Sequence, residues 1–305
     1  MTDARRGSAS RHVATGIGDA VLEMRARRSV DGRPTLLIHG AAGSARTWDD
    51  LLATPAATTA TGMIASIDLP GWGASTSRLP RDATLADMRR SVLACLDVLE
   101  RETGAAGPWQ LVGHSMGGLL ALDVAAAAPD RVAAVIAVSP SASGVIRSVT
   151  DPWASLLGGR RAGGLPALVL LTGGLRLFAG LDRFSPALMM VLERIGVLRL
   201  LTLPLFRHPF QVPRRVVRRL GLELRPHSFA AATRSVARYD LEQWTAIRAA
   251  VTTIEGDRDV FVGEEDARAV RRTIPQSTRI VESDCGHFPH VERAGAVASI
   301  VWPTR

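Results

Sequence analysis

The chain has 305 residues and a formal net charge of +8, and hydrophobic residues make up 47% of it. Such a composition excludes an intrinsically disordered chain and is ordinary for a globular protein that folds by burying apolar side chains. The length exceeds that of the usual single domain, but it suits one α/β core that carries an insertion.

Cysteine usage and the N-terminal residues exclude several classes of protein. Cys95 and Cys285 are too few for a disulfide framework, and neither has zinc-type spacing to other Cys or His residues. We therefore expect no metal and no other cofactor. The first thirty residues show scattered Arg, Ser and Gly without a continuous apolar stretch. No secretory signal is visible in them, so we expect a cytoplasmic protein.

Positive charge is concentrated in one segment of the chain. All 37 basic residues are Arg, and residues 141–240 hold 15 of them beside five acids. This segment therefore carries ten excess positive charges, which leaves −2 for the rest of the chain. The arginines are interleaved with apolar residues and no recognised nucleic-acid-binding motif accompanies them, so we expect no nucleic-acid partner.

Apolar runs alternate with helical patterns in the first half of the chain. The runs predict strands at residues 35–39, 63–68, 109–113 and 132–139, with helices at residues 84–102 and 116–128. Thr84 can cap the first helix together with Asp87, and Gly104 can close it. Pro129 stops the second helix. This alternation is typical of a parallel sheet with crossover helices.

The alternation stops after residue 139 and resumes near residue 250. Residues 142–240 contain apolar helical stretches interrupted by Gly, Pro and Arg, without a strand pattern. Beyond them the sequence predicts a strand at 251–255, a helix at 264–274, a strand at 278–282 and a last helix that begins near residue 290. We therefore expect one core, residues 1–140 and 241–305, with residues 141–240 inserted as a helical cap.

A nucleophile motif lies between the third predicted strand and the helix after it. Residues 113–118 read Gly-His-Ser-Met-Gly-Gly, and Gly-x-Ser-x-Gly between a strand and a helix is typical of a nucleophile elbow. The turn is tight, so glycines avoid collisions with neighbouring elements while the hydroxyl of Ser115 stays exposed. The helix that starts at Met116 adds free backbone N–H groups beneath the reacting centre.

Further motifs, in the same order along the chain, resemble those of the α/β-hydrolase superfamily. They are His39-Gly40 after a strand, Asp-Leu-Pro-Gly-Trp-Gly-Ala-Ser at residues 68–75, Gly-Asp-Arg-Asp at residues 256–259, and Gly286-His287 followed by Glu292. The resemblance covers roughly residues 10–140 and 241–300. It implies an α/β-hydrolase fold, with a mostly parallel sheet flanked by helices and an inserted helical cap.

The resemblance also implies a catalytic triad in the order Ser, Asp, His. His287 would act as the base for Ser115, because a serine hydroxyl is a poor nucleophile until its proton is removed. Asp259 would accept the other imidazole N–H, since the family places the acid three residues after the glycine. Asp257 stays open as an alternative acid, and its other interpretation is a turn residue that bonds its own loop.

Acyl transfer also needs two N–H donors that are in place before the reaction. Met116, directly after the nucleophile, supplies one, and Ala41, directly after His39-Gly40, would supply the other. Dehalogenases and epoxide hydrolases of similar architecture have Asp at the elbow, so Ser115 favours acyl transfer to water. We predict a serine hydrolase that cleaves an ester or related acyl bond of a hydrophobic small molecule through an acyl-enzyme. The motifs leave open a C–C bond hydrolase of dienoic diketo acids and a non-catalytic accessory or binding module of the same fold.

Other residues near these motifs are expected to be structural. His39 and His114 would pack or hydrogen-bond beneath the turns they introduce, and Trp72 would pack in its loop. Cys285 is expected to be a small buried residue, since no base is allotted to it. His290 is expected on the surface in the first turn of the last helix, with lining of the site as the alternative.

The predicted cap is the part of the chain that bears on specificity. Residues 165–205 hold dense apolar runs, which predict a cap that lines a hydrophobic pocket. Gly and Arg interrupt the longest run before it reaches the roughly 20 residues of a membrane span. On one helix, Arg214, Arg215, Arg218 and Arg219 would form a basic face. Weak contact between the cap and an anionic membrane surface is therefore a second expectation, whereas the oligomeric state is not specified by the sequence.

Overall fold

The computed structural model describes residues 8–25, 32–41, 43–105, 107–159, 164–178, 187, 191, 194–201 and 203–303. Within these residues, eight strands form one sheet with the order β1-β2-β4-β3-β5-β6-β7-β8. They are β1 (Ser8–Thr15), β2 (Gly18–Arg25), β3 (Thr35–Ile38), β4 (Ile64–Asp68), β5 (Trp109–His114), β6 (Val132–Val138), β7 (Ala250–Gly256) and β8 (Thr278–Glu282). The pairs β1–β2 and β2–β4 are antiparallel and all other neighbours are parallel, which confirms the mostly parallel sheet.

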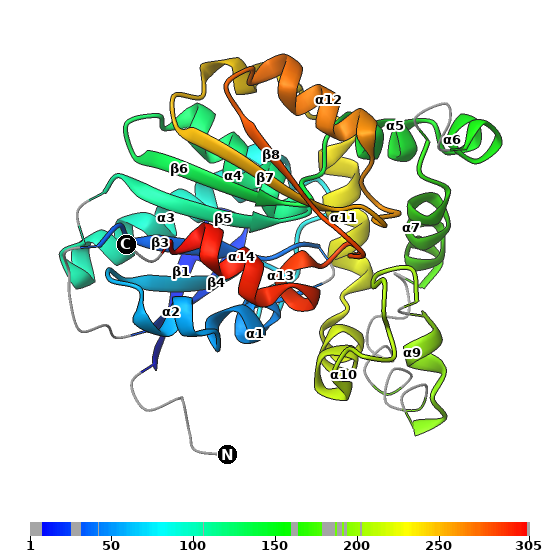
Figure 1. The fold of residues 1–305 in the computed structure, drawn as a ribbon, viewed down its shortest axis with the longest axis horizontal. Coiled ribbons are helices and arrows are strands. Elements are labelled where there is room, and N and C mark those ends of the chain that lie inside the picture. The colour runs from blue at the N-terminus through cyan, green and yellow to red at the C-terminus, as the bar shows by residue number, and fades with distance from the viewer. Residues whose placement is uncertain are drawn as a thin grey trace.

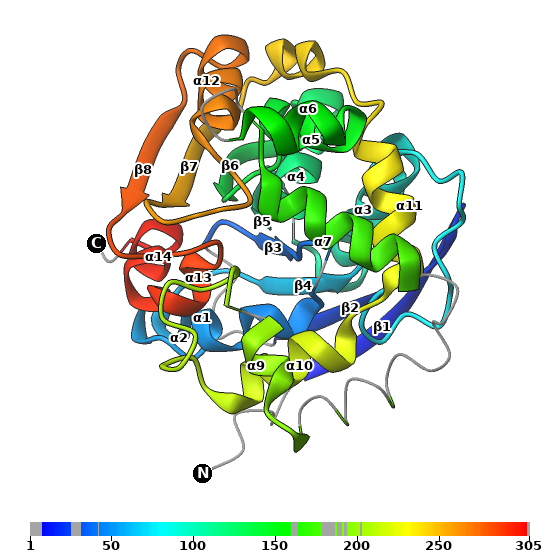
Figure 2. The same ribbon diagram turned by 90° about the vertical axis from the view of Figure 1, so that its right-hand side faces the viewer.

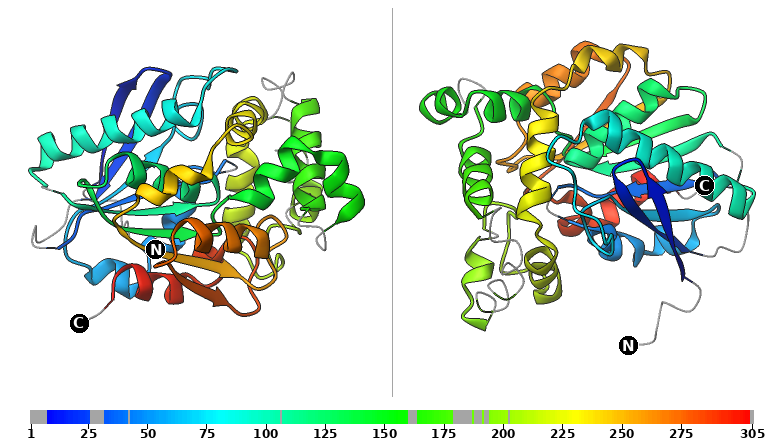
Figure 3. Two further views of the ribbon diagram at one scale, coloured as in Figure 1. Left: turned by 90° about the horizontal axis from the view of Figure 1, so that it is seen from above. Right: turned by 180° about the vertical axis from the view of Figure 1, so that it is seen from behind.

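Helices cover both faces of the sheet (Figure 3). They are α1 (Asp49–Leu52), α2 (Pro55–Thr59), α3 (Leu85–Thr103), α4 (Met116–Ala127), α12 (Glu264–Thr273), α13 (Pro289–Glu292) and α14 (Ala294–Val301), with the 3-10 helices η1 (Ala45–Trp48) and η4 (Leu241–Ala246). Successive side chains of β3 point to opposite faces. Leu36 and Ile38 pack with α3 and α4, whereas Leu37 packs with α1 and α14. The apolar core therefore lies in two layers, one on each face.

The local signals read from the sequence set the bounds of these elements. Thr84 and Asp87 form the capping box of α3, and Gly104 closes that helix in the left-handed conformation at a φ of 65°. The antiparallel hairpin β1–β2 was not predicted. Val13 is the only buried residue among the described side chains of β1, so no apolar alternation marks this edge strand. The last helix is also divided, because Arg293 between α13 and α14 leaves the helical conformation.

The described parts of the inserted segment, residues 141–240, form helices. They are α5 (Ser143–Thr150), α6 (Pro152–Gly158), α7 (Pro166–Phe178), α9 (Val197–Leu201), α10 (Arg214–Glu223) and α11 (Pro226–Val236). These helices stand together on one side of the sheet (Figure 1), and α7 and α11 cross in front of the strands when that side faces the viewer (Figure 2). No helix in the described part of the chain is both long and apolar enough to cross a membrane.

The start of the inserted segment is fixed by Asp266 of α12. Its Oδ1 accepts the backbone N–H groups of Ala142 and Gly144 at 2.8 and 3.1 Å, and that of Val145 at 3.2 Å. Asp266 is fully buried, and burial raises the pKa of its carboxyl to about 7. The first turn of α5 is thereby held against the core, next to the carboxyl ends of β6 and β7.

Candidate active site

Ser115 occupies a sharp turn between β5 and α4. Its backbone has a φ of 53° and a ψ of −117°, a conformation that L residues rarely adopt. A Cβ atom added to Gly113 would lie 2.1 Å from the carbonyl oxygen of Gly117, and one added to Gly117 would lie 2.3 Å from that of Ile38. The two glycines are therefore required by close backbone approach, as the elbow motif predicts. The first turn of α4 follows directly, so the N–H of Met116 lies beside the serine.

The carboxylate of Asp259 holds the imidazole of His287. Nδ1–H of His287 donates to Oδ2 of Asp259 at 2.8 Å, and both side chains are buried. Oδ1 of Asp259 accepts the backbone N–H groups of Phe261 and Val262 at 2.8 and 3.0 Å, so the carboxylate cannot rotate freely. Because a carboxylate only accepts, the imidazole proton lies on Nδ1. Nε2 of His287 is left with a lone pair, which is what a base requires.

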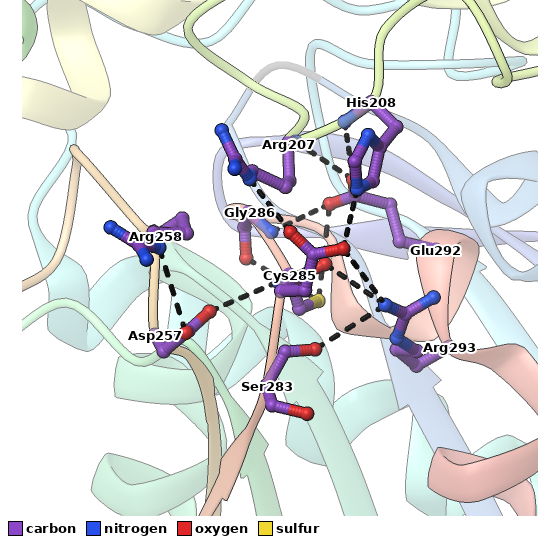
Figure 4. A network of polar contacts seen from close by, with 10 residues as sticks. Arg207, His208, Asp257, Arg258, Ser283, Cys285, Gly286, Glu292 and Arg293 are labelled. Carbon is purple, nitrogen blue, oxygen red and sulfur yellow. Dashed lines mark hydrogen bonds and ion pairs between the residues drawn. The ribbon is translucent and has the colours of Figure 1, made fainter.

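Asp257, the alternative acid, contacts Cys285 and Arg258 (Figure 4). Its Oδ1 accepts the backbone N–H of Cys285 at 3.1 Å, and its Oδ2 lies 3.6 Å from Nε of Arg258. Asp257 therefore has the loop-bonding role that the sequence left open for it, and the contact with His287 is made by Asp259.

Glu292 joins this loop to the inserted segment (Figure 4). Its Oε2 accepts the N–H of Gly286 at 2.8 Å, while its Oε1 accepts the N–H groups of Arg207 and His208 at 2.7 and 3.2 Å. The N–H of His287 donates to the carbonyl of Leu205 at 3.0 Å. Residues 205–208 and the loop before α13 are therefore one hydrogen-bonded unit. Glu292 belongs to a motif found in the sequence, but its role as a bridge to the insertion was not predicted.

Glu292→Ala should lower both stability and turnover. The substitution leaves three backbone N–H groups without their acceptor, and each unpaired donor that stays buried costs about 1–3 kcal/mol. The loop that positions His287 would loosen, so kcat should fall by about tenfold or more. Urea unfolding and ester hydrolysis measure the two effects, with exposed Glu242→Ala as the control. Unchanged kcat and stability in Glu292→Ala would contradict the bridging role.

The loop that carries Ala41 is held from two sides. The N–H of Leu69 donates to Nε2 of His39 at 3.1 Å, so Nδ1 of His39 carries the proton and donates to the carbonyl of Gly40 at 2.7 Å. Burial lowers the pKa of His39, which keeps this neutral form. Nε1–H of Trp72 donates to the carbonyl of Ala41 at 2.7 Å. The structural role predicted for His39 is confirmed, whereas the hydrogen bond of Trp72 was not predicted.

The same loop lies against the nucleophile. A Cβ atom added to Gly40 would lie 3.2 Å from Cβ of Ser115 and 2.9 Å from Nδ1 of His114. Ala41 and Met116 both line the cavity that Ser115 lines. The two backbone segments expected to form an oxyanion hole therefore meet at the serine.

Two more histidines pack behind His287. Nε2–H of His114 donates to the carbonyl of His287 at 2.9 Å, and burial holds the pKa of His114 well below its usual range. His114 is structural, as predicted. The prediction for His290 was wrong, because this side chain is fully buried with its ring centroid 4.4 Å from that of Trp48 and 4.5 Å from that of His114. The one-turn helix α13 packs against α1 and η1, so its first turn does not face solvent. Burial lowers the pKa of His290 to about 3.

Cys285 has the properties of a structural thiol. It is buried and unpaired, as predicted. Burial, followed by the negative charge of Glu292, raises the pKa of its thiol to about 12. A thiol nucleophile must ionise to react, so Cys285 is unreactive at neutral pH.

Ser115 and His287 line one cavity of about 70 Å³ between the core and the inserted segment. The apolar side chains around it are Met116, Val145, Val149, Leu168, Leu171, Leu205, Phe229, Ala232, Val236, Phe261 and Phe288. Of the described residues that line it, none is Arg, Asp or Glu. Residues 179–186, 188–190, 192–193 and 202 of the predicted apolar region lie outside the described residues. Within the described residues, helices α5, α7 and α11 supply most of the apolar side chains that line the cavity.

Curated proteins match this chain over part of its length. The dihydrolipoyllysine-residue acetyltransferase component of the acetoin cleaving system of Pseudomonas putida is 36% identical over 113 residues, which are 37% of this chain and 28% of that protein. The (E)-2-((N-methylformamido)methylene)succinate hydrolase of Acinetobacter baylyi is 34% identical over 102 residues, 33% of this chain and 35% of that protein. The matched part of the chain thus spans about a third of the length of these relatives.

Comparisons of fold and of family extend over much more of the chain. A thermophilic esterase from Thermogutta terrifontis superposes with a TM-score of 0.70 at 23% identity and covers 96% of both chains, which shows a shared fold. A sequence model of the alpha/beta hydrolase family matches residues 35–300. This protein therefore belongs to the alpha/beta hydrolase family.

Proposed function

We propose that this protein is a hydrolase that cleaves a carboxylic ester or related acyl bond of a hydrophobic small molecule, with Ser115 as nucleophile. One observation carries the proposal: Ser115 and His287 line the same apolar cavity, and His287 is held by Asp259 in the tautomer that leaves Nε2 unprotonated. A base in that state next to a serine on a strained elbow suits nucleophilic catalysis.

The proposed reaction has two halves. Nε2 of His287 takes the hydroxyl proton of Ser115 as its oxygen attacks the carbonyl carbon, and Asp259 stabilises the imidazolium that forms. The N–H groups of Ala41 and Met116 bind the oxyanion of the tetrahedral intermediate. Collapse of the intermediate expels the alcohol, which receives the proton from His287, and leaves an acyl-enzyme. Water then attacks the acyl carbon while His287 takes its proton. Collapse of the second tetrahedral intermediate releases the acid, and His287 returns the proton to the oxygen of Ser115.

The lining of the cavity favours this chemistry over the other two candidates. A C–C bond hydrolase of the kind that the motifs leave open would take a diketo acid. The carboxylate of that acid would be buried without a cationic partner among the described lining residues, which is costly. An uncharged ester meets no such cost. A non-catalytic module does not need a serine, an oriented imidazole and two backbone N–H donors at one point. Their presence together therefore supports an enzyme.

The size of the cavity favours a short acyl chain. We expect kcat/KM for p-nitrophenyl butyrate to exceed that for p-nitrophenyl palmitate by about tenfold or more, since each methylene that finds no room forgoes about 0.8 kcal/mol of burial. Leu168 of α7 lines the cavity, so Leu168→Ala should shift the optimum to longer chains. Leu170 on the same helix is 68% exposed, and Leu170→Ala is the matched control. Equal activity on all chain lengths in all three proteins would contradict this specificity.

A contact with anionic membranes is the second proposal, and exposed apolar side chains support it. Trp153 and Leu157 of α6 are 73% and 88% exposed, and Phe210 is 68% exposed. They belong to the segment that carries the excess of arginine. The basic face expected on α10 is partly neutralised, however, because Arg215 and Arg219 pair with Asp50 and Asp49 of α1. Adsorption would therefore depend more on apolar insertion than on charge.

Co-sedimentation with vesicles tests this contact. Anionic vesicles at low salt should bind the protein, and Trp153→Ser combined with Leu157→Ser should reduce the bound fraction by about fivefold or more, because two apolar side chains no longer insert. Val281 lies outside the segment and is 49% exposed, so Val281→Ser is the control. A lack of binding to anionic vesicles at low salt, or equal binding by the double variant, would refute the proposal.

A further inference from the structure

A second cavity, of about 410 Å³, lies between the start of α3 and the end of α11. It shares no lining residue with the cavity at Ser115. Four arginines line it: Arg81 before α3, Arg89 within α3, and Arg234 and Arg238 at the end of α11 and just beyond it. Figure 2 shows α11 and α3 side by side at this point. The loop before α3 is fastened to α11, since Nε of Arg234 donates to the carbonyl of Arg81 at 3.4 Å.

The acidic residues near this cavity do not neutralise all of its arginines. Nη1 of Arg89 lies 2.9 Å from the buried carboxylate of Asp123, which neutralises the charge of this arginine. Asp240 lines the cavity, but its Oδ1 accepts the N–H of Glu242 at 3.0 Å and caps η4. Asp82 also lines the cavity. Three arginines therefore share this cavity with two carboxylates, one of which has a structural role.

Arg234 is surrounded by positive charge. The charged groups that act on it are Arg176 of α7, Arg81 and Arg238. Burial, followed by repulsion from these three arginines, lowers the pKa of Arg234 below its usual value. Like charges held together at one place raise the free energy of the folded protein, and a bound anion removes that cost.

Neutral polar groups complete the walls. Thr84, Gln243 and Ser235 also line the cavity. Oγ1 of Thr84 already donates to Oδ2 of Asp87 at 2.6 Å, whereas Oγ of Ser235 is buried without a hydrogen-bond partner in the described structure. Guanidinium groups beside hydroxyl and amide donors form the donor set that binds phosphate oxygens. The volume leaves room for an organic residue attached to the phosphate.

We infer that this cavity binds a phosphate group, carried by a small organic phosphate or by a lipid headgroup, with Arg234 and Arg238 as its principal ligands. Arg81 closes the site from the opposite wall. Arg234 of α11 and Arg238, two residues beyond the helix end, both line this cavity. Thr233 and Val236, beside them in sequence, face the cavity at Ser115 instead, so this site is separate from the catalytic one and independent of the proposed reaction.

Calorimetric titration of the full chain with pyrophosphate, at constant ionic strength in chloride, tests the site. The wild type should show saturable binding, and Arg234→Gln combined with Arg238→Gln should weaken it by about a hundredfold, or roughly tenfold for each charge-assisted hydrogen bond removed. Arg248 is 74% exposed and paired with Asp130 elsewhere, so Arg248→Gln is the matched control and should bind as the wild type does. Circular dichroism and urea unfolding should give the same result for all three proteins, which shows that the variants fold.

Vesicles distinguish the two sources of phosphate. Phosphatidylcholine vesicles with and without phosphatidic acid are sedimented with the wild type and with the double variant. Binding of pyrophosphate alone identifies a soluble phosphate, whereas binding to phosphatidic acid that the double variant lacks identifies a headgroup. Absence of both kinds of binding in the wild type, or binding of equal strength in the double variant, would overturn the inference.

Discussion

Ser115→Ala should lower kcat for ester hydrolysis by about 10⁴-fold or more while the protein stays folded. The alanine removes the oxygen that forms the acyl-enzyme, and it keeps the backbone conformation of the elbow, which depends on Gly113 and Gly117. His287→Ala should cost a similar factor, because without the base the hydroxyl remains protonated. The double variant should be hardly slower than either single one, since the two side chains act as a unit. Initial rates with p-nitrophenyl butyrate measure all three.

Ser141→Ala is the control for this series. Ser141 is a second serine that lines the same cavity, but it lies outside the elbow. Its removal should leave kcat within about threefold of the wild type, as for a substitution that removes no reacting group. Circular dichroism and urea unfolding establish that each variant is folded. Near-wild-type activity in Ser115→Ala, or strictly additive losses in the double variant, would reject the mechanism.

Asp259→Asn should lower kcat by about 10³- to 10⁴-fold, because it would change which nitrogen of His287 carries the proton. Oδ1 of Asp259 accepts two backbone N–H groups, so the amide of an asparagine would place its oxygen there and turn its NH₂ toward His287. Nδ1 of His287 would then have to accept, and the proton would move to Nε2. The imidazole would keep its position but lose the lone pair on Nε2 that a base requires.

Asp257→Asn is the matched control, and it should retain activity within about fivefold. The amide oxygen can still accept the N–H of Cys285, and the substitution removes only a solvent-exposed ion pair with Arg258, whose N–O distance is 3.6 Å. Measured pH–rate profiles add a second readout. The profile should change in Asp259→Asn, because the tautomer of His287 changes, and it should stay the same in Asp257→Asn, which removes only a surface charge. If Asp257→Asn were inactive and Asp259→Asn active, the catalytic acid would be Asp257 and not Asp259.

The core and its motifs could be predicted because short-range rules determine them. The elbow needs glycine where a Cβ would meet a carbonyl oxygen at little more than 2 Å, so its motif is readable without a structure. The helix after Thr84 is likewise marked at both ends by residues whose own backbone and side chains form the caps. Parallel strands such as β3 are buried along their whole length and mostly apolar, which distinguishes them from the helices between them.

The features that escaped prediction depend on contacts between distant segments. His290 is buried because α13 packs on α1 and η1, a contact that no local pattern near residue 290 encodes. Glu292 binds the N–H groups of residues 207 and 208, about 85 positions earlier in the chain. The pairing of Arg215 and Arg219 with α1 likewise changes a face that looks purely basic in the sequence. The hairpin β1–β2 has an exposed edge strand, so its residues carry little apolar periodicity.

Covalent labelling tests the central claim most directly, since it reports on the nucleophile itself and needs no knowledge of the natural substrate. The folded wild type is treated with a fluorophosphonate, and the modified peptide is identified by mass spectrometry. We predict one adduct on Ser115, absent from Ser115→Ala and strongly slowed in His287→Ala, because the phosphorus is attacked only by an activated hydroxyl. A wild type that takes up no label, or takes it up on a residue other than Ser115, would contradict the account.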